Sequence, residues 1–132
     1  MRPKREVRSV LDASGLLAYF QREPGYERVR KALADGAAIS AVNLAEVYAK
    51  VVERGLPLED IAQRLHALGL GVATFGEEDA RRSAGFHPET RKLGLSLGDR
   101  ACLALGARLG LPVLTADRAW IRLAGVNVEL VR

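Results

Sequence analysis

The run Val7-Arg-Ser-Val-Leu-Asp-Ala-Ser-Gly-Leu-Leu-Ala-Tyr-Phe20 joins a short, apolar, strand-like segment to a helix-like one through Asp12. Near the other end of the chain, Pro112-Val-Leu-Thr-Ala-Asp-Arg-Ala-Trp120 repeats this arrangement around Asp117. In an open α/β sheet, ligands bind in the crevice at the carboxyl ends of the strands. Two strands could therefore bring both carboxylates to one crevice, where close like charges are unfavourable without a cation. The pair indicates a metal site.

The length and composition are those of one globular domain. A chain of 132 residues fits a single domain, and at this size folding buries roughly two-thirds of the surface that the unfolded chain exposes. No uninterrupted apolar run is long enough to predict a membrane span, and no secretory signal is expected behind the basic N-terminus. Cys102 is the single cysteine, so the simplest setting is a reducing cytoplasm.

The chain is basic, with 20 Lys and Arg against 16 Asp and Glu and a net charge of +4. Arginine greatly outnumbers lysine, and guanidinium groups pair well with phosphates, so a nucleic-acid partner is compatible with this balance. Many soluble proteins are equally basic without binding nucleic acid, so charge alone leaves both interpretations open.

Apolar segments with strand and helix character alternate along the chain, which predicts an α/β fold around a parallel sheet. No element is predicted for 85–94, because Pro88 interrupts the pattern there. We expect strands over 7–11, 37–40, 72–75, 112–115 and 127–131, and helices over 14–21, 26–34, 44–54, 57–68, 77–83, 98–109 and 118–123.

Three acidic residues carry a structural interpretation beside the metal-binding one. Asp12 and Asp117 each precede a predicted helix, where an aspartate is an ordinary N-cap, and Thr115 competes with Asp117 for that role. Asp99 follows Ser96 by three residues, which resembles a capping box. Asp99 also shares the inward helical face of residues 102, 103 and 106, where a carboxylate needs a partner because buried charge is costly.

Glu46 is not singled out by its helical pattern. It lies opposite the apolar stripe of Leu44, Val47 and Val51, with Lys50 one turn further on. Periodicity therefore predicts a solvated Glu–Lys pair at this position.

The sequence gives little support for a zinc site, a phosphate-binding loop or a serine nucleophile. His66 and His87 have no zinc-ligand spacing to each other or to Cys102, and no phosphate-binding glycine loop is present. No G-x-S-x-G element occurs, and Ser14 lacks a convincing histidine partner. The remaining acid-rich, oxygen-only chemistry suits hard divalent cations such as Mg²⁺ or Mn²⁺.

Four segments, each with one of these acidic residues, match the motifs of a known family in their order along the chain. Val10-Leu-Asp-Ala-Ser-Gly-Leu-Leu-Ala18, Asn43-Leu-Ala-Glu-Val47, Leu95-Ser-Leu-Gly-Asp-Arg-Ala-Cys-Leu-Ala-Leu105 and Leu114-Thr-Ala-Asp-Arg-Ala-Trp120 resemble the motifs of PIN-domain ribonucleases. Their order and spacing are similar to those of the VapC-type toxins of toxin–antitoxin pairs. The resemblance implies one PIN-like domain over residues 1–132, with a three-layer α/β/α sandwich, a central parallel sheet and an acidic pocket at the strand ends.

The resemblance also implies an activity, a metal and a set of site residues. The expected activity is hydrolysis of RNA phosphodiester bonds with one or two Mg²⁺ or Mn²⁺ ions, whose bound water attacks the phosphate. The expected catalytic and metal-binding acids are Asp12, Glu46, Asp99 and Asp117, with Ser14 and Thr115 as supporting polar residues.

Basic residues and one helical pair are the expected contacts with RNA and with a partner. Arg100 and Arg118 each follow a motif acid and are candidates for the RNA backbone, although solvated arginine explains them as well. Solvated surface is likewise the simpler explanation of Arg81, Arg82, Arg91 and Lys92. In the family, helices such as 44–54 and 58–68 form a groove for the antitoxin, here with Tyr48, Val52 and Leu56, and the toxin is commonly a homodimer.

Other assignments either fit the residues less well or stay open. A phosphatase of the haloacid dehalogenase type would need a second aspartate where Ser14 stands. A receiver domain would need a late lysine after a strand, and Lys92, the last lysine, does not follow one. A solitary PIN nuclease and a PIN-like module that binds RNA or protein without cutting stay open, although all four acidic positions are filled. The RNA target, the number of metal ions and the antitoxin are not indicated.

Overall fold

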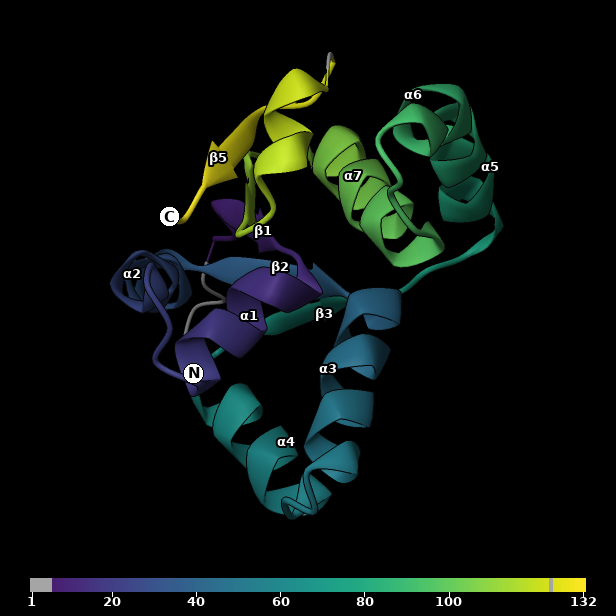
Figure 1. Ribbon diagram of the computed structural model, residues 1–132. Coiled ribbons are helices and arrows are strands. Elements are labelled where there is room, and N and C mark those ends of the chain that lie inside the picture. Colours follow the sequence, from purple (N-terminus) through teal and green to yellow (C-terminus); the bar gives the residue numbers. More distant parts are fainter. Residues whose placement is uncertain (1–5, 124) are drawn as a thin grey trace.

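A computed structural model describes residues 6–123 and 125–132, so the basic segment 1–5 lies outside the described residues. Within this part of the chain, the central element is a five-stranded, wholly parallel sheet with the strand order β3-β2-β1-β4-β5 (Figure 1). The strands are β1 (Ser9–Leu11), β2 (Ala37–Ser40), β3 (Gly71–Ala73), β4 (Val113–Thr115) and β5 (Val128–Leu130).

Helices connect the strands, largely where the sequence pattern predicts them. Two segments differ: 85–94 contains the end of one helix and a second short helix, with Pro88 in a first turn where proline is tolerated. The predicted helix over 118–123 is a 3₁₀ helix, η1 (Arg118–Arg122). The α-helices are α1 (Ala13–Phe20), α2 (Tyr26–Asp35), α3 (Ala41–Glu53), α4 (Leu58–Ala67), α5 (Glu77–Gly85), α6 (His87–Lys92) and α7 (Leu97–Leu109).

Alternation along the strands divides the core into two layers. Val10 and Val113 are fully buried on the face that α7 and η1 cover. Their neighbours Leu11 and Leu114 are fully buried on the opposite face, against α1, α2 and α3. Successive strand side chains point to opposite faces, so both faces of the sheet are covered by helices. The predicted three-layer α/β/α sandwich is confirmed.

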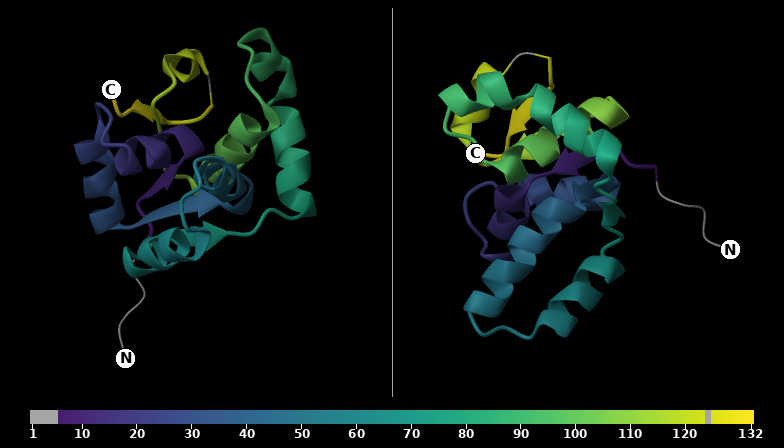
Figure 2. Two further views of the ribbon diagram at one scale, coloured as in Figure 1. Left: turned by 60° about the horizontal axis from the view of Figure 1, so that its bottom comes forward. Right: turned by 90° about the vertical axis from the view of Figure 1, so that its right-hand side faces the viewer.

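Two helices, α3 and α4, project together from one end of the sandwich (Figures 1 and 2). Val51, Ile61 and Leu65 pack between these helices and the main core. Within 6–123 and 125–132, none of the helices has the length and hydrophobicity of a membrane-spanning segment.

The strand order places the first and fourth strands side by side at the centre of the sheet. From β1 the chain moves outward to β2 and β3, and it then returns to place β4 on the other side of β1. The connections therefore diverge between β1 and β4, and such a switch point leaves a crevice at the carboxyl ends of the two strands. Leu11 is paired with Leu114, so the residues that follow them, Asp12 and Thr115, meet at this crevice.

Candidate active site

Asp12 lies directly after β1 and caps the N-terminus of α1. Only 3% of its surface is exposed. The carboxylate accepts hydrogen bonds from the backbone N–H of Gly15 at 2.7 Å, from the Thr115 hydroxyl at 2.5 Å and from the Ser14 hydroxyl at 2.8 Å. Capping and delivery of a carboxylate to the crevice are thus combined in one side chain.

Burial gives Asp12 an unusual proton affinity. Loss of hydration raises the pKa of this carboxyl from 3.8 to about 6, because the ionised form is poorly solvated. The hydrogen bonds from Thr115, Gly15 and Ser14 oppose the rise in pKa, and the negative charge of Asp99 adds to it. A cation beside Asp12 would favour the ionised form again.

The end of β4 is joined to the same network. The Thr115 side-chain oxygen accepts the backbone N–H of Asp117 at 3.0 Å, and the Ser14 oxygen accepts that of Ala116 at 3.1 Å. Asp117 is exposed and caps η1 by accepting the Ala119 N–H at 3.0 Å. The two predicted supporting residues, Ser14 and Thr115, therefore connect both strand ends.

Asp99 enters the site from the first turn of α7. The predicted capping box is present: the Ser96 N–H donates to Asp99 at 2.8 Å, and the Asp99 N–H donates to the Ser96 hydroxyl at 3.2 Å. Asp99 is half-buried, and the next turn of its helical face, at Cys102, is fully buried. This agrees with the inward face that the helical periodicity predicts.

Glu46 reaches the site from α3. The side chain is exposed, as periodicity predicts, but the predicted pair with Lys50 is wrong, because Lys50 lies 3.5 Å from Glu53 instead. Glu46 accepts a hydrogen bond from the Asn43 amide at 3.0 Å, and its carboxylate rests against Gly98 in α7. Contact with α7, which lies outside the pattern of α3, determines where this carboxylate lies.

Three of these carboxyls influence one buried thiol in α7. The pKa of Cys102 is raised well above its ordinary value, first by burial and then by the negative charges of Asp12, Asp99 and Glu46. Asp117 is linked to Asp12 through its backbone N–H, which donates to the Thr115 hydroxyl that in turn donates to Asp12. We call Asp12, Glu46, Asp99 and Asp117 the acidic cluster.

The donor atoms of the acidic cluster suit a hard divalent cation. All four side chains offer carboxylate oxygens, which Mg²⁺ and Mn²⁺ prefer. Across 6–123 and 125–132, no three Asp, Glu, His or Cys side chains already lie close enough to share one ion.

The candidate RNA contacts differ in how freely they reach solvent. Arg118 is exposed beside Asp117, whereas Arg100 is half-buried and donates to the Leu95 carbonyl at 3.4 Å. Arg81 pairs with Glu77 at 2.8 Å on the surface of α5.

Two residues that contact Glu46, namely Asn43 and Gly98, had no role assigned from the sequence.

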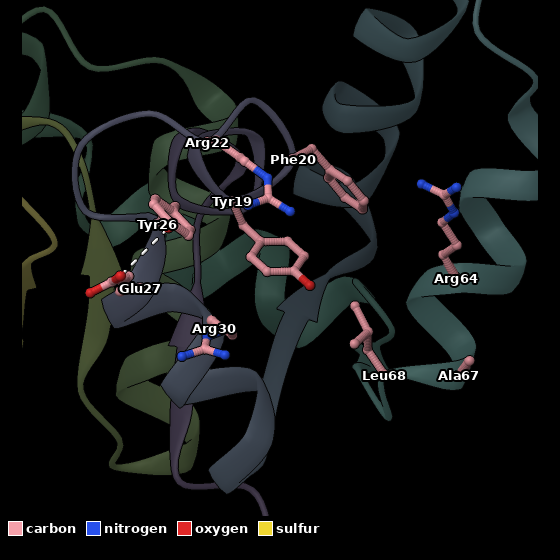
Figure 3. Close-up of a pocket in the computed structure, with 9 residues that line it drawn as sticks. All are labelled: Tyr19, Phe20, Arg22, Tyr26, Glu27, Arg30, Arg64, Ala67 and Leu68. Atoms are coloured by element: carbon pink, nitrogen blue, oxygen red, sulfur yellow. Dashed lines mark hydrogen bonds between the residues drawn. The ribbon is translucent and has the colours of Figure 1, made fainter.

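A separate hollow of about 620 Å³ lies at the opposite end of α1, between α1, α2 and α4 (Figure 3). An adjoining hollow of about 200 Å³ between α1, α3 and α4 is lined partly by Arg54 and Leu56. Phe20 and Arg64 line both, and we call the two together the basic groove. The larger hollow is lined by the rings of Tyr19, Phe20 and Tyr26 and by the guanidinium groups of Arg22, Arg30 and Arg64.

Comparison with known proteins gives one family and a set of similar folds. The family model described as PIN domain matches residues 9–126. No curated protein matches the chain. A toxin–antitoxin complex from Klebsiella pneumoniae has a chain that is 18% identical, with a TM-score of 0.73 over 94% of this chain and 98% of that one.

Two further solved structures have the same fold. DNA-bound VapBC from Salmonella typhimurium contains a chain with 17% identity and a TM-score of 0.74, which covers 96% of this chain and 100% of that one. VapC20 from Mycobacterium tuberculosis, described as a sarcin-ricin loop cleaving toxin, is 12% identical with a TM-score of 0.67, over 90% and 98% of the two chains.

Proposed function

The chain belongs to the PIN domain family, and from this membership and the geometry of the acidic cluster we propose that it is a metal-dependent endoribonuclease. The observation that carries the proposal is the position of Asp12. It is buried at the switch point of a parallel sheet, its pKa is raised to about 6, and the charge of Asp99 lies close enough to contribute to the rise. A perturbed carboxyl in a crevice is typical of a functional site.

The side chains have separate roles in this proposal. Asp12 and Asp99 would bind an Mg²⁺ or Mn²⁺ ion directly, and Glu46 and Asp117 would hold it directly or through water. Such a cation would supply a water molecule of lowered pKa and stabilisation of negative charge on the phosphate oxygens. Ser14 and Thr115 hold the Asp12 carboxylate in one orientation through their hydroxyl groups.

Basic side chains at the rim orient the RNA backbone. Arg118 is exposed directly after Asp117, so its guanidinium group is available to a phosphate. Arg100 is partly engaged with the Leu95 carbonyl, so we assign it a smaller share of binding. Contacts of this kind give affinity without sequence preference, and they leave the choice among transfer, ribosomal and messenger RNA to other surfaces.

We further propose that the nuclease is the toxin of a type II toxin–antitoxin pair in the cytoplasm, with a VapB-type antitoxin as its partner and a homodimer as its assembly. Solved structures with the same fold include toxin–antitoxin complexes, some of them bound to DNA. The basic groove is the proposed docking site of the antitoxin segment. Within the described residues Arg30 and Arg64 form no ion pair, so the groove favours an acidic segment with an apolar anchor.

Cleavage of defined RNAs tests the enzymatic proposal. Purified protein is incubated with transfer, ribosomal and messenger RNA in Mg²⁺, in Mn²⁺ and in EDTA, and the cut ends are mapped. We expect discrete cuts with either metal and none in EDTA, and loss of the cuts in Asp99→Asn. Equal cutting by Asp99→Asn, or by the wild type in EDTA, would contradict the proposal. RNA binding without any cleavage would favour the non-cleaving PIN-like module.

A further inference from the structure

One amide, that of Asn43, connects α3 with the start of α7. Asn43 is 1% exposed. Its Nδ2 group donates to Glu46 Oε1 at 3.0 Å, one turn further along the same helix, and to the carbonyl oxygen of Gly98 at 2.9 Å. A single NH₂ group therefore fixes the Glu46 carboxylate relative to the first turn of the helix that carries Asp99.

The amide is oriented by these two acceptors. Asn43 Oδ1 is buried and has no hydrogen-bond donor within the part of the chain described. Exchanging its oxygen and nitrogen would turn the oxygen toward two other oxygens, so only one orientation is favourable. A buried acceptor without a donor is costly. The amide nevertheless keeps the orientation in which its NH₂ group bonds both to the buried Gly98 carbonyl and to Glu46, and this places the Glu46 carboxylate beside α7.

Gly98 completes the arrangement from the other side. A Cβ atom at this position would lie 2.7 Å from Glu46 Oε2, which is closer than real Cβ atoms approach other heavy atoms. Gly98 lies within α7, where alanine would be the better helix former, so helical conformation does not require glycine here. The space beside Gly98 is occupied by the Glu46 carboxylate, and any side chain at residue 98 would displace it.

We propose that Asn43 and Gly98 are positioning residues that hold the Glu46 carboxylate in place for metal binding. This inference rests on the proposed function. Glu46 is exposed on α3, and without these contacts its side chain would sample several rotamers, which must be restricted when a metal binds. Asn43 supplies the attraction and Gly98 supplies the space, so the carboxylate is already placed beside α7 before the ion arrives.

Binding of Mn²⁺ measured by isothermal titration calorimetry tests this proposal independently of cleavage. Loss of an outer-shell partner typically weakens metal binding about 10–100-fold, and we expect this loss in both Asn43→Ala and Gly98→Ala. Gly98→Ala should unfold at the same temperature as the wild type in EDTA, or higher, because it adds a helix former. The matched control is Gly85→Ala in α5, where an added Cβ meets nothing within 4 Å, and its Mn²⁺ affinity should equal that of the wild type.

Double mutants show whether the two residues act through Glu46. In the Glu46→Ala background, neither Asn43→Ala nor Gly98→Ala should weaken Mn²⁺ binding further, because the carboxylate that they position is gone. Additive losses would overturn the inference, and so would wild-type affinity in both single variants. If Asn43→Ala fails to fold, Gly98→Ala and its double mutant still decide the outcome.

The same measurements separate this inference from the proposed function. If Glu46→Ala and Asp12→Asn weaken Mn²⁺ binding and cleavage while Gly98→Ala does not, only the positioning role fails. If Glu46→Ala and Asp12→Asn leave both quantities unchanged, the metal-dependent site itself is wrong, and the positioning role fails with it.

Discussion

Asp12 and Glu46 belong to one acidic cluster, yet the fold holds them in opposite ways. Asp12 is buried between two strand ends, and its carboxylate accepts hydrogen bonds from the backbone of Gly15 and from two hydroxyl groups. Glu46 is exposed on α3 and accepts its hydrogen bond from Asn43. Burial raises the pKa of Asp12, and contact with Asn43 and Gly98 accounts for the position of the Glu46 carboxylate.

At Asp12 the fold buries a charge at an energetic cost, whereas at Glu46 it positions a carboxylate that stays exposed. An ionised carboxylate at Asp12 lowers the stability of the fold, because folding removes the water that would solvate it. Glu46 is exposed, so folding leaves its carboxylate in contact with water. Removal of the charge should therefore affect both function and stability at Asp12, in opposite directions, and function alone at Glu46.

The largest effect is expected from Asp12→Asn. Removing a direct ligand should lower the rate of metal-dependent RNA cleavage by about a hundredfold or more. In EDTA at pH 8 the same variant should be more stable than the wild type by about 1–3 kcal/mol, because it no longer buries a charge. Cleavage assays and urea unfolding measure the two quantities.

Full cleavage activity in Asp12→Asn would remove Asp12 from the site. A loss of stability in EDTA would instead mean that the hydrogen bonds to the ionised carboxylate outweigh the cost of burying its charge. Ser9→Ala, a buried substitution in β1 just before this carboxylate, is the control for general disturbance of the strand. It should leave the pH dependence of stability unchanged.

The pH dependence of stability tests whether burial raises the pKa of Asp12. Well below pH 3.8 Asp12 is protonated in both the folded and the unfolded chain. Between pH 4 and 6 the folded chain retains the proton and the unfolded chain loses it, so the free energy of unfolding falls as pH rises. The rise in pKa from 3.8 to about 6 corresponds to about 3 kcal/mol, complete near pH 7.

Urea unfolding in EDTA, as a function of pH, measures this term as the difference between the wild type and Asp12→Asn. The difference removes every contribution to stability that does not depend on the Asp12 carboxyl. A difference that is constant between pH 4 and 7 would show that burial does not raise the pKa of Asp12.

The same contrast explains which parts of the site were predictable from sequence. Asp12 and Asp117 follow apolar strand-like runs, and parallel strands bring such residues to one edge of the sheet, so their proximity could be expected. Asp99 could be placed on an inward face because the periodicity of α7 is regular over the helix. The α/β fold around a parallel sheet followed from the alternation of strands and helices, and the three-layer arrangement followed from the resemblance to PIN-domain ribonucleases.

The placement of Glu46 could not be derived from the pattern of its own helix. A helical pattern describes which face of α3 meets the core, but the Glu46 carboxylate is positioned by Gly98, which is far away in sequence and belongs to α7. Asn43 gave a local signal, since it stands three residues before Glu46 and can contact it. Its second contact, with the Gly98 carbonyl 55 residues away, needed the tertiary structure.

Glu46→Gln tests whether the charge of the exposed Glu46 carboxylate serves metal binding and cleavage without affecting stability. The substitution keeps the shape and one acceptor oxygen, so the Asn43 hydrogen bond can persist while the charge is lost. We expect Mn²⁺ affinity and cleavage to fall about 10–100-fold, with the free energy of unfolding in EDTA within about 0.5 kcal/mol of the wild type. A stability change as large as that of Asp12→Asn would erase the distinction between the two positions.

The smallest effect is expected from Lys50→Ala, which asks whether Glu46 belongs to the surface of α3 or to the site. Lys50 lies 3.5 Å from Glu53, and both side chains are more than half exposed. Exposed ion pairs contribute little, so unfolding free energy should change by less than about 0.5 kcal/mol and cleavage by less than about twofold. If Lys50→Ala changed Mn²⁺ affinity as strongly as Glu46→Gln, Lys50 and Glu46 would be electrostatically coupled. The surface pair that periodicity predicts would then form in solution, and Asn43 and Gly98 would not alone determine where Glu46 lies.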